Sequence, residues 1–289
     1  MKIGVIGTGL MGQPLALRLL KRGHTVIAYN RTPEKLTAIA AAGGAIAPDA
    51  ATVCQQSSVV ILFLTDAIAI ETLLFNPATL PHLAGTTLIQ MGTIAPAQSQ
   101  QLAEQVQTAG GDYLEAPVLG SIPQVKAGTL LVMVGSTLAQ YQQQLPLFQA
   151  LGENPQHIGP VGTAAALKLA LNQLIGSLTT AFALSLDFVQ QAGVPVDTFM
   201  QILRESALYA PTFDKKLTRM VQGNFANPNF PAKHLLKDMQ LFDEAAKEQN
   251  PAQNTAIVQG VIAVVRDAIA AGHTDDDYSS LYTAISQVV

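Results

Sequence analysis

The chain has 289 residues, which is enough for two domains and a substantial buried core. Hydrophobic residues make up 49% of it and charged residues only 12%, so the composition excludes a disordered chain. The formal net charge is -4 and no basic block occurs, which argues against nucleic acid as a partner. The single cysteine, Cys54, excludes an internal disulfide and fits a reducing, cytoplasmic setting.

Two apolar stretches invite comparison with membrane segments. The N-terminal run is interrupted by Gly7, Gly9 and Gly12 and lacks a charged leader, so we do not expect a signal peptide. Residues 169–186 carry no charge and reach the bare length of a spanning helix. Polar side chains are scattered around that stretch, however, so we expect a helix buried at a domain or subunit interface and a soluble protein without membrane contact.

The first part of the chain alternates apolar strands with helical patterns. We expect strands at 2–6, 25–29, 59–64, 86–91, 112–116 and 130–134, and helices at 14–22, 33–42 and 95–108. Such alternation predicts a mostly parallel sheet covered on both faces. The sequence therefore predicts an α/β fold whose N-terminal domain, residues 1–162, is a doubly wound Rossmann sheet.

After residue 162 the strand signals stop. We expect one long helix over 163–191, ended by Gly193 and Pro195, and then a helix over 198–205 with Asp197 as its N-cap. Further helices are expected at 211–221, 232–248 and 255–271. This part, residues 163–289, is predicted to be an all-α C-terminal domain that the long helix joins to the first, and we expect homo-oligomerisation through it.

A glycine motif follows the first expected strand directly. Gly7, Gly9 and Gly12 have G-x-G-x-x-G spacing and stand between a strand and a helix, as dinucleotide binding requires. The N-terminus of that helix offers free N–H groups and partial positive charge to phosphates. The expected cofactor-binding residues here are Gly7, Thr8, Gly9, Leu10, Met11 and Gly12.

The end of the second strand predicts which dinucleotide binds. NAD-binding proteins usually have an acidic residue there to accept hydrogen bonds from the ribose 2′-hydroxyl, whereas this chain has Asn30, Arg31 and Thr32. A guanidinium pairs with a 2′-phosphate that a carboxylate would repel. We therefore predict NADP(H). Leu64 and Thr65, at the end of the strand from residue 59, join the expected cofactor-binding set.

Other polar residues occur at strand ends or in apolar surroundings. Thr93 follows a strand and is placed to face the nicotinamide. The segment 115–121 runs from a strand into a loop of small residues, where doubly wound sheets bind ligands. Lys168 and Asn172 are four residues apart on the long helix and share a face.

Together these motifs resemble the β-hydroxyacid dehydrogenase family, which includes 3-hydroxyisobutyrate dehydrogenase, over nearly the whole chain. Its glyoxylate/succinic semialdehyde reductase branch is the most similar, through Asn30-Arg31-Thr32, a substrate loop ending in Gly-Ser, and the segment 230–238. The four ordered motifs are 7–12, 115–121, 159–172 and the pair Lys237-Asp238.

The resemblance implies a general acid/base role for Lys168, with Asn172 orienting it or the substrate. It implies that a small carboxylate substrate is bound by the loop Leu119, Gly120 and Ser121, while Thr93 and Lys237 contact the cofactor or close the site and Asp238 supports that closure. No metal signature is found among the five histidines, so no metal is expected.

Two departures from the family pattern bear on the substrate, and several alternatives remain. Leu119 replaces a usual Ser, and Gly92 stands where a Ser commonly precedes the Thr. Leu171 replaces the His of phosphogluconate dehydrogenases, and Lys168 argues against an imine reductase. We expect an NADPH-dependent reductase of glyoxylate or succinic semialdehyde. The alternatives are an NADP-linked 3-hydroxyisobutyrate-type dehydrogenase and a non-catalytic dinucleotide sensor.

Overall fold

The computed structural model describes residues 2–286, and the chain forms two compact units, Met1–Lys168 and Leu169–Val289. The division falls inside the long helix predicted for residues 163–191. The domain boundary predicted from the sequence lies just before that helix, at residue 162. Each unit has a hydrophobic core of its own.

The first unit is built on a twisted sheet. Its strands are β1 (Lys2–Ile6), β2 (Thr25–Tyr29), β3 (Ala45–Ile46), β4 (Val59–Leu62), β5 (Thr87–Gln90), β6 (Asp112–Glu115), β7 (Val118–Leu119), β8 (Leu131–Gly135) and β9 (Gln156–Gly159). Their order is β3-β2-β1-β4-β5-β6-β8-β7, and β9 pairs with β8. The strands from β3 to β6 are parallel, while β8 runs antiparallel to β6 and β7. The predicted Rossmann sheet is confirmed.

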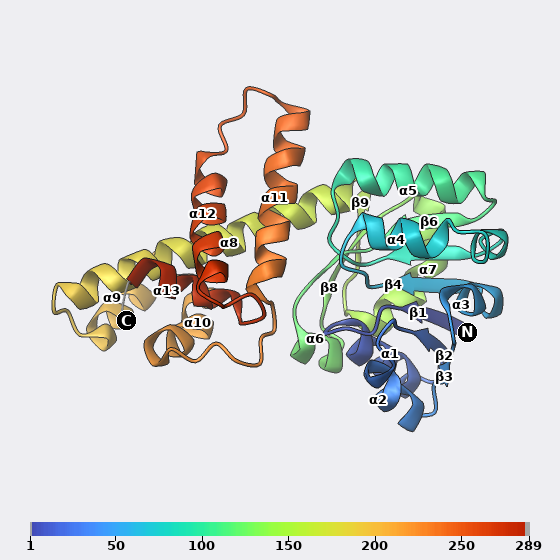
Figure 1. Ribbon diagram of the computed structural model, residues 1–289, viewed down its shortest axis with the longest axis horizontal. Helices are drawn as coiled ribbons and strands as arrows, with labels where there is room; N and C mark the ends of the chain where they lie inside the picture. Colours follow the sequence, from blue (N-terminus) through green and yellow to red (C-terminus); the bar gives the residue numbers. More distant parts are fainter. Residues whose placement is uncertain (1, 287–289) are drawn as a thin grey trace. The chain divides into compact units, whose positions relative to one another are not determined.

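Helices cover both faces of this sheet (Figure 1). They are α1 (Gly12–Lys21), α2 (Thr37–Ala41), α3 (Ala50–Gln56), α4 (Ala67–Leu74), α5 (Pro96–Thr108), α6 (Ile122–Ala127) and α7 (Leu138–Leu151), with 3-10 turns η1 (Pro33–Leu36) and η2 (Leu80–His82). Buried side chains of α1, α6 and α7 share one core cluster with the sheet, and those of α3, α4 and α5 share the other. Because both faces are covered, β4 is buried at every position, as its continuous Val-Val-Ile-Leu run predicts.

The strand order places the ligand edge of the sheet. β1 lies between β2 and β4, so the chain leaves β1 toward one side and returns to the other. In doubly wound sheets this reversal opens a crevice at the carboxyl ends of the strands. The glycine motif follows β1 directly and therefore lies at the switch point.

The second unit is helical. Its elements are α8 (Thr163–Gln191), which begins in the first unit, and then α9 (Val196–Glu205), α10 (Pro211–Gln222), α11 (Ala232–Gln249), α12 (Ala256–Ala270), η3 (Tyr278–Ser280) and α13 (Leu281–Ser286). α11 and α12 pack against each other over much of their length (Figure 1). The bounds of α8 are those predicted, and the all-helical character of this unit is confirmed.

One predicted helix start is wrong. α9 begins at Val196 after Pro195, which is its N-cap residue, so Asp197 is not the cap. Pro195 has φ -59° and ψ 133°, a non-helical conformation typical of an N-cap residue, and no side chain caps the first turn. Asp197 instead lies in the first turn, where its negative charge complements the helix dipole.

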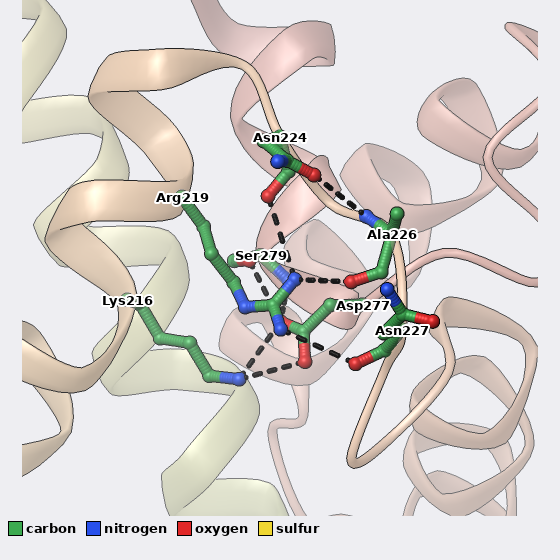
Figure 2. A network of polar contacts seen from close by, with 7 residues as sticks. All are labelled: Lys216, Arg219, Asn224, Ala226, Asn227, Asp277 and Ser279. Carbon is green, nitrogen blue, oxygen red and sulfur yellow. Dashed lines mark hydrogen bonds and ion pairs between the residues drawn. The ribbon is translucent and has the colours of Figure 1, made fainter.

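A buried ion pair fixes the turn that precedes α13. The ammonium of Lys216 on α10 lies 2.7 Å and 2.9 Å from the two carboxylate oxygens of Asp277, which also accepts hydrogen bonds from the backbone and hydroxyl of Ser279 (Figure 2). The same ammonium lies 4.1 Å from the ring centre of Tyr278. Both charges are buried, so each depends on the other to offset its lost hydration.

This turn also holds the beginning of α11. Ala232 donates its N–H to the carbonyl of Asp276, and Tyr278 donates to Phe230. Arg219 adds hydrogen bonds to carbonyl groups of the loop after α10, those of Asn224, Ala226 and Asn227 (Figure 2). The network therefore anchors the helix on which Lys237 and Asp238 lie.

Candidate active site

The three motif glycines serve different purposes. Gly7 has φ +91°, and a Cβ there would collide with the carbonyl oxygen of Phe63. A Cβ on Gly12 would collide with the carbonyl oxygen of Gly7. Gly9 differs, because no atom lies within 4 Å of the place its Cβ would take. The protein's own packing thus requires Gly7 and Gly12, whereas Gly9 keeps the backbone open to an approaching group such as a pyrophosphate.

The end of β2 is fastened to this glycine loop by a side chain. Asn30 accepts a hydrogen bond from the N–H of Thr8 at 3.0 Å and donates one to the carbonyl of Thr32 at 3.1 Å. Among residues 2–286, the hydroxyl of Thr8 is buried with no hydrogen-bond partner. Arg31 follows Asn30 directly and is exposed, so its guanidinium is accessible to a dinucleotide lying along the loop. The residues fit a phosphorylated dinucleotide.

The ends of β4 and β5 complete this edge of the sheet. Leu64 and Thr65 follow β4, and Gly92 and Thr93 follow β5, which is its parallel neighbour. A Cβ on Gly92 would lie 2.6 Å from the carbonyl oxygen of Leu64. The close approach of the two strand ends therefore explains why this chain has Gly rather than Ser at position 92.

The predicted substrate loop runs from β7 into the short helix α6. Gly120 has φ +135°, a conformation that favours glycine, and Ser121 follows it as the N-cap residue of α6. Both donors of Ser121, its N–H and its hydroxyl, lie 2.9 Å from the amide oxygen of Gln124. These are the donors predicted for a substrate carboxylate, and Gln124 is not among the predicted site residues. The signal was present, since Ser-x-x-Gln is the spacing of a capping box.

Lys168 and Asn172 lie one turn apart on α8, as predicted from their spacing. Asn172 is only 2% exposed, and its amide nitrogen donates to Asp238 at 2.6 Å. Asp238, which is equally buried, has its other carboxylate oxygen 2.9 Å from the ammonium of Lys237. The carbonyl oxygen of the Asn172 side chain is buried and has no hydrogen-bond partner in the described part of the chain. Asp238 thus fixes which end of the amide is left to accept a hydrogen bond.

A reactive cysteine and a metal site are two further possibilities for chemistry in this protein. Cys54 is buried in the core beside the sheet, and burial raises the pKa of its thiol to about 12, so it is not a nucleophile at neutral pH. Across residues 2–286, no group of three histidine, cysteine or acidic side chains is arranged to hold a metal ion.

Two family models cover almost the whole chain. Residues 2–159 match the NAD binding domain of 6-phosphogluconate dehydrogenase, and residues 162–285 match the NAD-binding domain of NADP-dependent 3-hydroxyisobutyrate dehydrogenase. This chain belongs to the β-hydroxyacid dehydrogenase family. It is an NAD(P)-dependent oxidoreductase that acts on hydroxyl or aldehyde groups.

Curated relatives that are named as a reductase or a dehydrogenase agree with this assignment. Glyoxylate/succinic semialdehyde reductase 1 of Arabidopsis thaliana is 29% identical over 99% of this chain and 98% of its own length. The 2-(hydroxymethyl)glutarate dehydrogenase of Eubacterium barkeri is 31% identical over 86% of this chain and 83% of its own. Cytokine-like nuclear factor N-PAC of Homo sapiens is 30% identical, but this chain spans only 51% of that protein.

Solved structures show the same fold. A 3-hydroxyisobutyrate dehydrogenase from Salmonella typhimurium superposes with a TM-score of 0.87 at 21% identity, covering 98% of this chain and 99% of that one. An imine reductase from Myxococcus stipitatus in complex with NADP+ gives 0.68 at 23% identity, covering 97% and 98%. Although α8 is long and apolar enough to cross a membrane, it lies within the matched dehydrogenase region and is a helix of this soluble fold.

Proposed function

We propose that this protein is an NADPH-dependent reductase of small carboxylate-bearing aldehydes, with glyoxylate and succinic semialdehyde as the first candidates. The observation that carries the proposal is the arrangement on α8. Asn172 is held by Asp238 with its amide oxygen unpartnered among the described residues, one turn from Lys168. This supports a site that binds a hydroxyl or ammonium beside a proton donor. The Arabidopsis relative supports the substrate class.

The reaction needs a proton donor at the carbonyl oxygen. A reduced nicotinamide cofactor held at the glycine motif 7–12 would supply hydride to the carbonyl carbon, so that negative charge would develop on the aldehyde oxygen. Lys168 stabilises that negative charge and passes its ammonium proton to the oxygen, giving the hydroxy acid. Solvent then returns a proton to the neutral amine. Asn172 accepts a hydrogen bond from the ammonium or from the new hydroxyl, which orients the pair.

The loop after β7 is the proposed carboxylate site. Ser121 presents its N–H and hydroxyl in the same direction, because one oxygen of Gln124 receives both. A substrate carboxylate oxygen has the same requirement and would take the place of the Gln124 amide. Leu119 supplies an apolar wall where a Ser would add a further hydrogen bond, which favours a substrate with little polarity beyond its carboxylate.

A screen of substrates tests this function. Consumption of NADPH should be measured with glyoxylate, succinic semialdehyde and methylmalonate semialdehyde, and each should be paired with an aldehyde of similar size that lacks the carboxylate. We expect much higher kcat/KM for the carboxylates, because an uncharged aldehyde leaves the Ser121 donors without an anionic acceptor. Equal efficiency with uncharged aldehydes would contradict the role of the loop.

A second candidate is the oxidative reaction. The match of residues 162–285 to NADP-dependent 3-hydroxyisobutyrate dehydrogenase favours an NADP-linked 3-hydroxyisobutyrate-type dehydrogenase. The same screen separates the two possibilities when it is run with NADP+ and the corresponding alcohols. A higher kcat/KM for 3-hydroxyisobutyrate than for any aldehyde reduction would favour the dehydrogenase.

We also propose that the protein is a cytoplasmic homo-oligomer that associates through the helical unit. Leu174, Leu178, Leu184 and Phe188 lie within about a third of the circumference of α8, and all are exposed; Phe188 is 71% exposed. Four large apolar side chains exposed on one side of a helix are unusual on a soluble monomer. A second copy of this apolar strip is the proposed occupant, since cyclic dimers pair identical patches.

A further inference from the structure

Glu115, at the end of β6, is a buried carboxylate that contacts the beginning of α8. It is 1% exposed. One of its oxygens accepts hydrogen bonds from the backbone N–H groups of Gly162, Ala164 and Ala165, at 2.8, 2.9 and 3.0 Å. The first N–H groups of a helix have no partner within the helix. Glu115 therefore caps the N-terminus of α8 from strand β6, and it lies 47 residues before Gly162 in the chain.

The second oxygen of Glu115 is fixed as firmly as the first. It accepts a hydrogen bond from the hydroxyl of Ser99 on α5, which in turn lies 2.9 Å from the hydroxyl of Tyr113. Gly135 on β8 packs so close that a Cβ there would collide with the carboxylate. Burial raises the pKa of the Glu115 carboxyl, although its hydrogen bonds oppose that shift. An apolar side chain of the same size would avoid this desolvation, so the value of Glu115 lies in the bonds it accepts.

We infer that Glu115 is a positioning residue for Lys168. Lys168 follows Ala165 by three residues, which is about 4.5 Å along the helix axis at the usual rise per residue. Helix ends fray unless they are capped, and a frayed first turn would change both the height and the rotation of the next one. The hydrogen bonds that Glu115 accepts from the amides of Gly162, Ala164 and Ala165 therefore set where the Lys168 side chain begins. The inference rests on the proposed role of Lys168 as proton donor.

A pair of volume-matched variants tests this role. Glu115→Met fills the same space but accepts no hydrogen bond, whereas Glu115→Gln keeps an acceptor oxygen for the helix amides. The Gln amide nitrogen can donate to Ser99, because the Ser99 hydroxyl can turn and donate to Tyr113 instead. Val106→Ala, which removes buried volume from α5 at a site away from α8, controls for lost stability.

The expected result is a split between kcat and binding. Glu115→Met should lower kcat about tenfold to a hundredfold, the usual effect of a misplaced catalytic group, while the Kd for NADPH stays near the wild-type value. Glu115→Gln should recover most of kcat. Val106→Ala should leave kcat unchanged despite a lower Tm. A Glu115→Met enzyme with wild-type kcat, or a Glu115→Gln enzyme as impaired as Glu115→Met, would overturn the inference.

Amide hydrogen exchange provides a readout that needs no activity. In the wild-type protein we expect protection of the amides at residues 162–168, and faster exchange there in Glu115→Met but not in Glu115→Gln. The rate at which an amine-reactive reagent labels Lys168 should likewise change in Glu115→Met and stay near the wild-type rate in Glu115→Gln. If the wild-type enzyme reduced no aldehyde, the proposed function would fail while these two measurements still decided the inference. Unchanged exchange and labelling in Glu115→Met would refute it.

Discussion

Gln124 receives both hydrogen-bond donors of Ser121 through a single amide oxygen, at 2.9 Å from the backbone nitrogen and 2.9 Å from the hydroxyl. These are the donors proposed for the substrate carboxylate. The side chain that caps α6 and the substrate therefore compete for one place, and binding of substrate carries the cost of displacing an internal hydrogen-bond acceptor.

Removing this competitor should tighten substrate binding. Gln124→Ala is expected to lower KM for carboxylate aldehydes about two- to tenfold, the equivalent of 0.5–1.5 kcal/mol for the displaced hydrogen bonds. Uncharged aldehydes should be unaffected. Steady-state kinetics with each substrate pair measures this difference.

The chain offers a matched control for that variant. Gln140 caps α7 in the same way, accepting from the N–H and hydroxyl of Thr137 at 3.1 and 3.0 Å, but it lies away from the loop. Gln140→Ala should cost similar helix stability and leave KM unchanged. A rise in KM in Gln124→Ala would mean that Gln124 shapes the loop for substrate instead of competing with it.

The preference for NADPH is tested at Arg31. Arg31→Ala should weaken NADPH binding by about 1.5–3 kcal/mol, the value of hydrogen bonds to a charged group, and should barely change NADH binding. Titration of cofactor fluorescence measures both. Arg22, an exposed arginine at the C-cap of α1, is the control, and Arg22→Ala should affect neither cofactor. Equal losses for NADPH and NADH in Arg31→Ala would assign Arg31 a structural role.

The sequence predicted elements best where one pattern was long and uninterrupted. The bounds of α8 follow from 29 residues that contain only two charges, Lys168 and Asp187, and end before Gly193. α7 was missed because Pro146 and several glutamines interrupt its apolar periodicity. β3 and β7 have two residues each, too few for any alternation to appear. The expected helix at 33–42 divides into η1 and α2.

Within the site, the sequence indicated the residue types but not their partners. The glycine spacing, Lys168 and Asn172 could be predicted because each pattern spans only a few residues. The glycines stand between a strand and a helix that follow each other along the chain, and the two polar residues are one helical turn apart. The hydrogen bond from Asn172 to Asp238 joins residues 66 apart, and nothing in either segment specifies the other. Glu115 was seen as part of a motif, but its contact with the start of α8 depends on how β6 packs below that helix.

The buried ion pair of the helical unit should matter far more for stability than an exposed pair on the same helix. Lys216→Met leaves Asp277 buried without its cation, which should lower the free energy of unfolding by about 3 kcal/mol or more. Arg204→Met breaks the exposed pair with Asp214 on α10 and should change the free energy of unfolding little, because water screens that pair. Urea unfolding compares them. Similar losses in the two variants would show that Asp277 is satisfied by Ser279 alone.

The proposed association is tested on the apolar strip of α8. Phe188→Glu places a charge at the most exposed position of that strip, and we expect it to convert the oligomer to a smaller species in light scattering at micromolar concentration. Ile68→Glu is the control, because Ile68 is 73% exposed but lies on α4 in the other unit. A monomeric wild-type protein, or an oligomer indifferent to Phe188→Glu, would rule out this interface.

The proton donor is tested at Lys168 itself. Hydride addition leaves negative charge on the substrate oxygen, so loss of the donor should affect the chemical step and not cofactor binding. Lys168→Ala is expected to lower kcat about a hundredfold or more, the usual contribution of general acid catalysis, with the Kd for NADPH nearly unchanged. Lys168→Arg keeps a positive charge but holds its proton too tightly and has a wider, planar head, so it should also be badly impaired.

Lys247→Ala removes an exposed helix lysine that pairs with Asp243, and it should turn over substrate at the wild-type rate. Single-turnover measurements with saturating NADPH separate the chemical step from product release. A Lys168→Ala enzyme within a few-fold of wild type in that assay would move the proton donor to ordered water held by Asn172, and Asn172→Ala would then become the decisive variant.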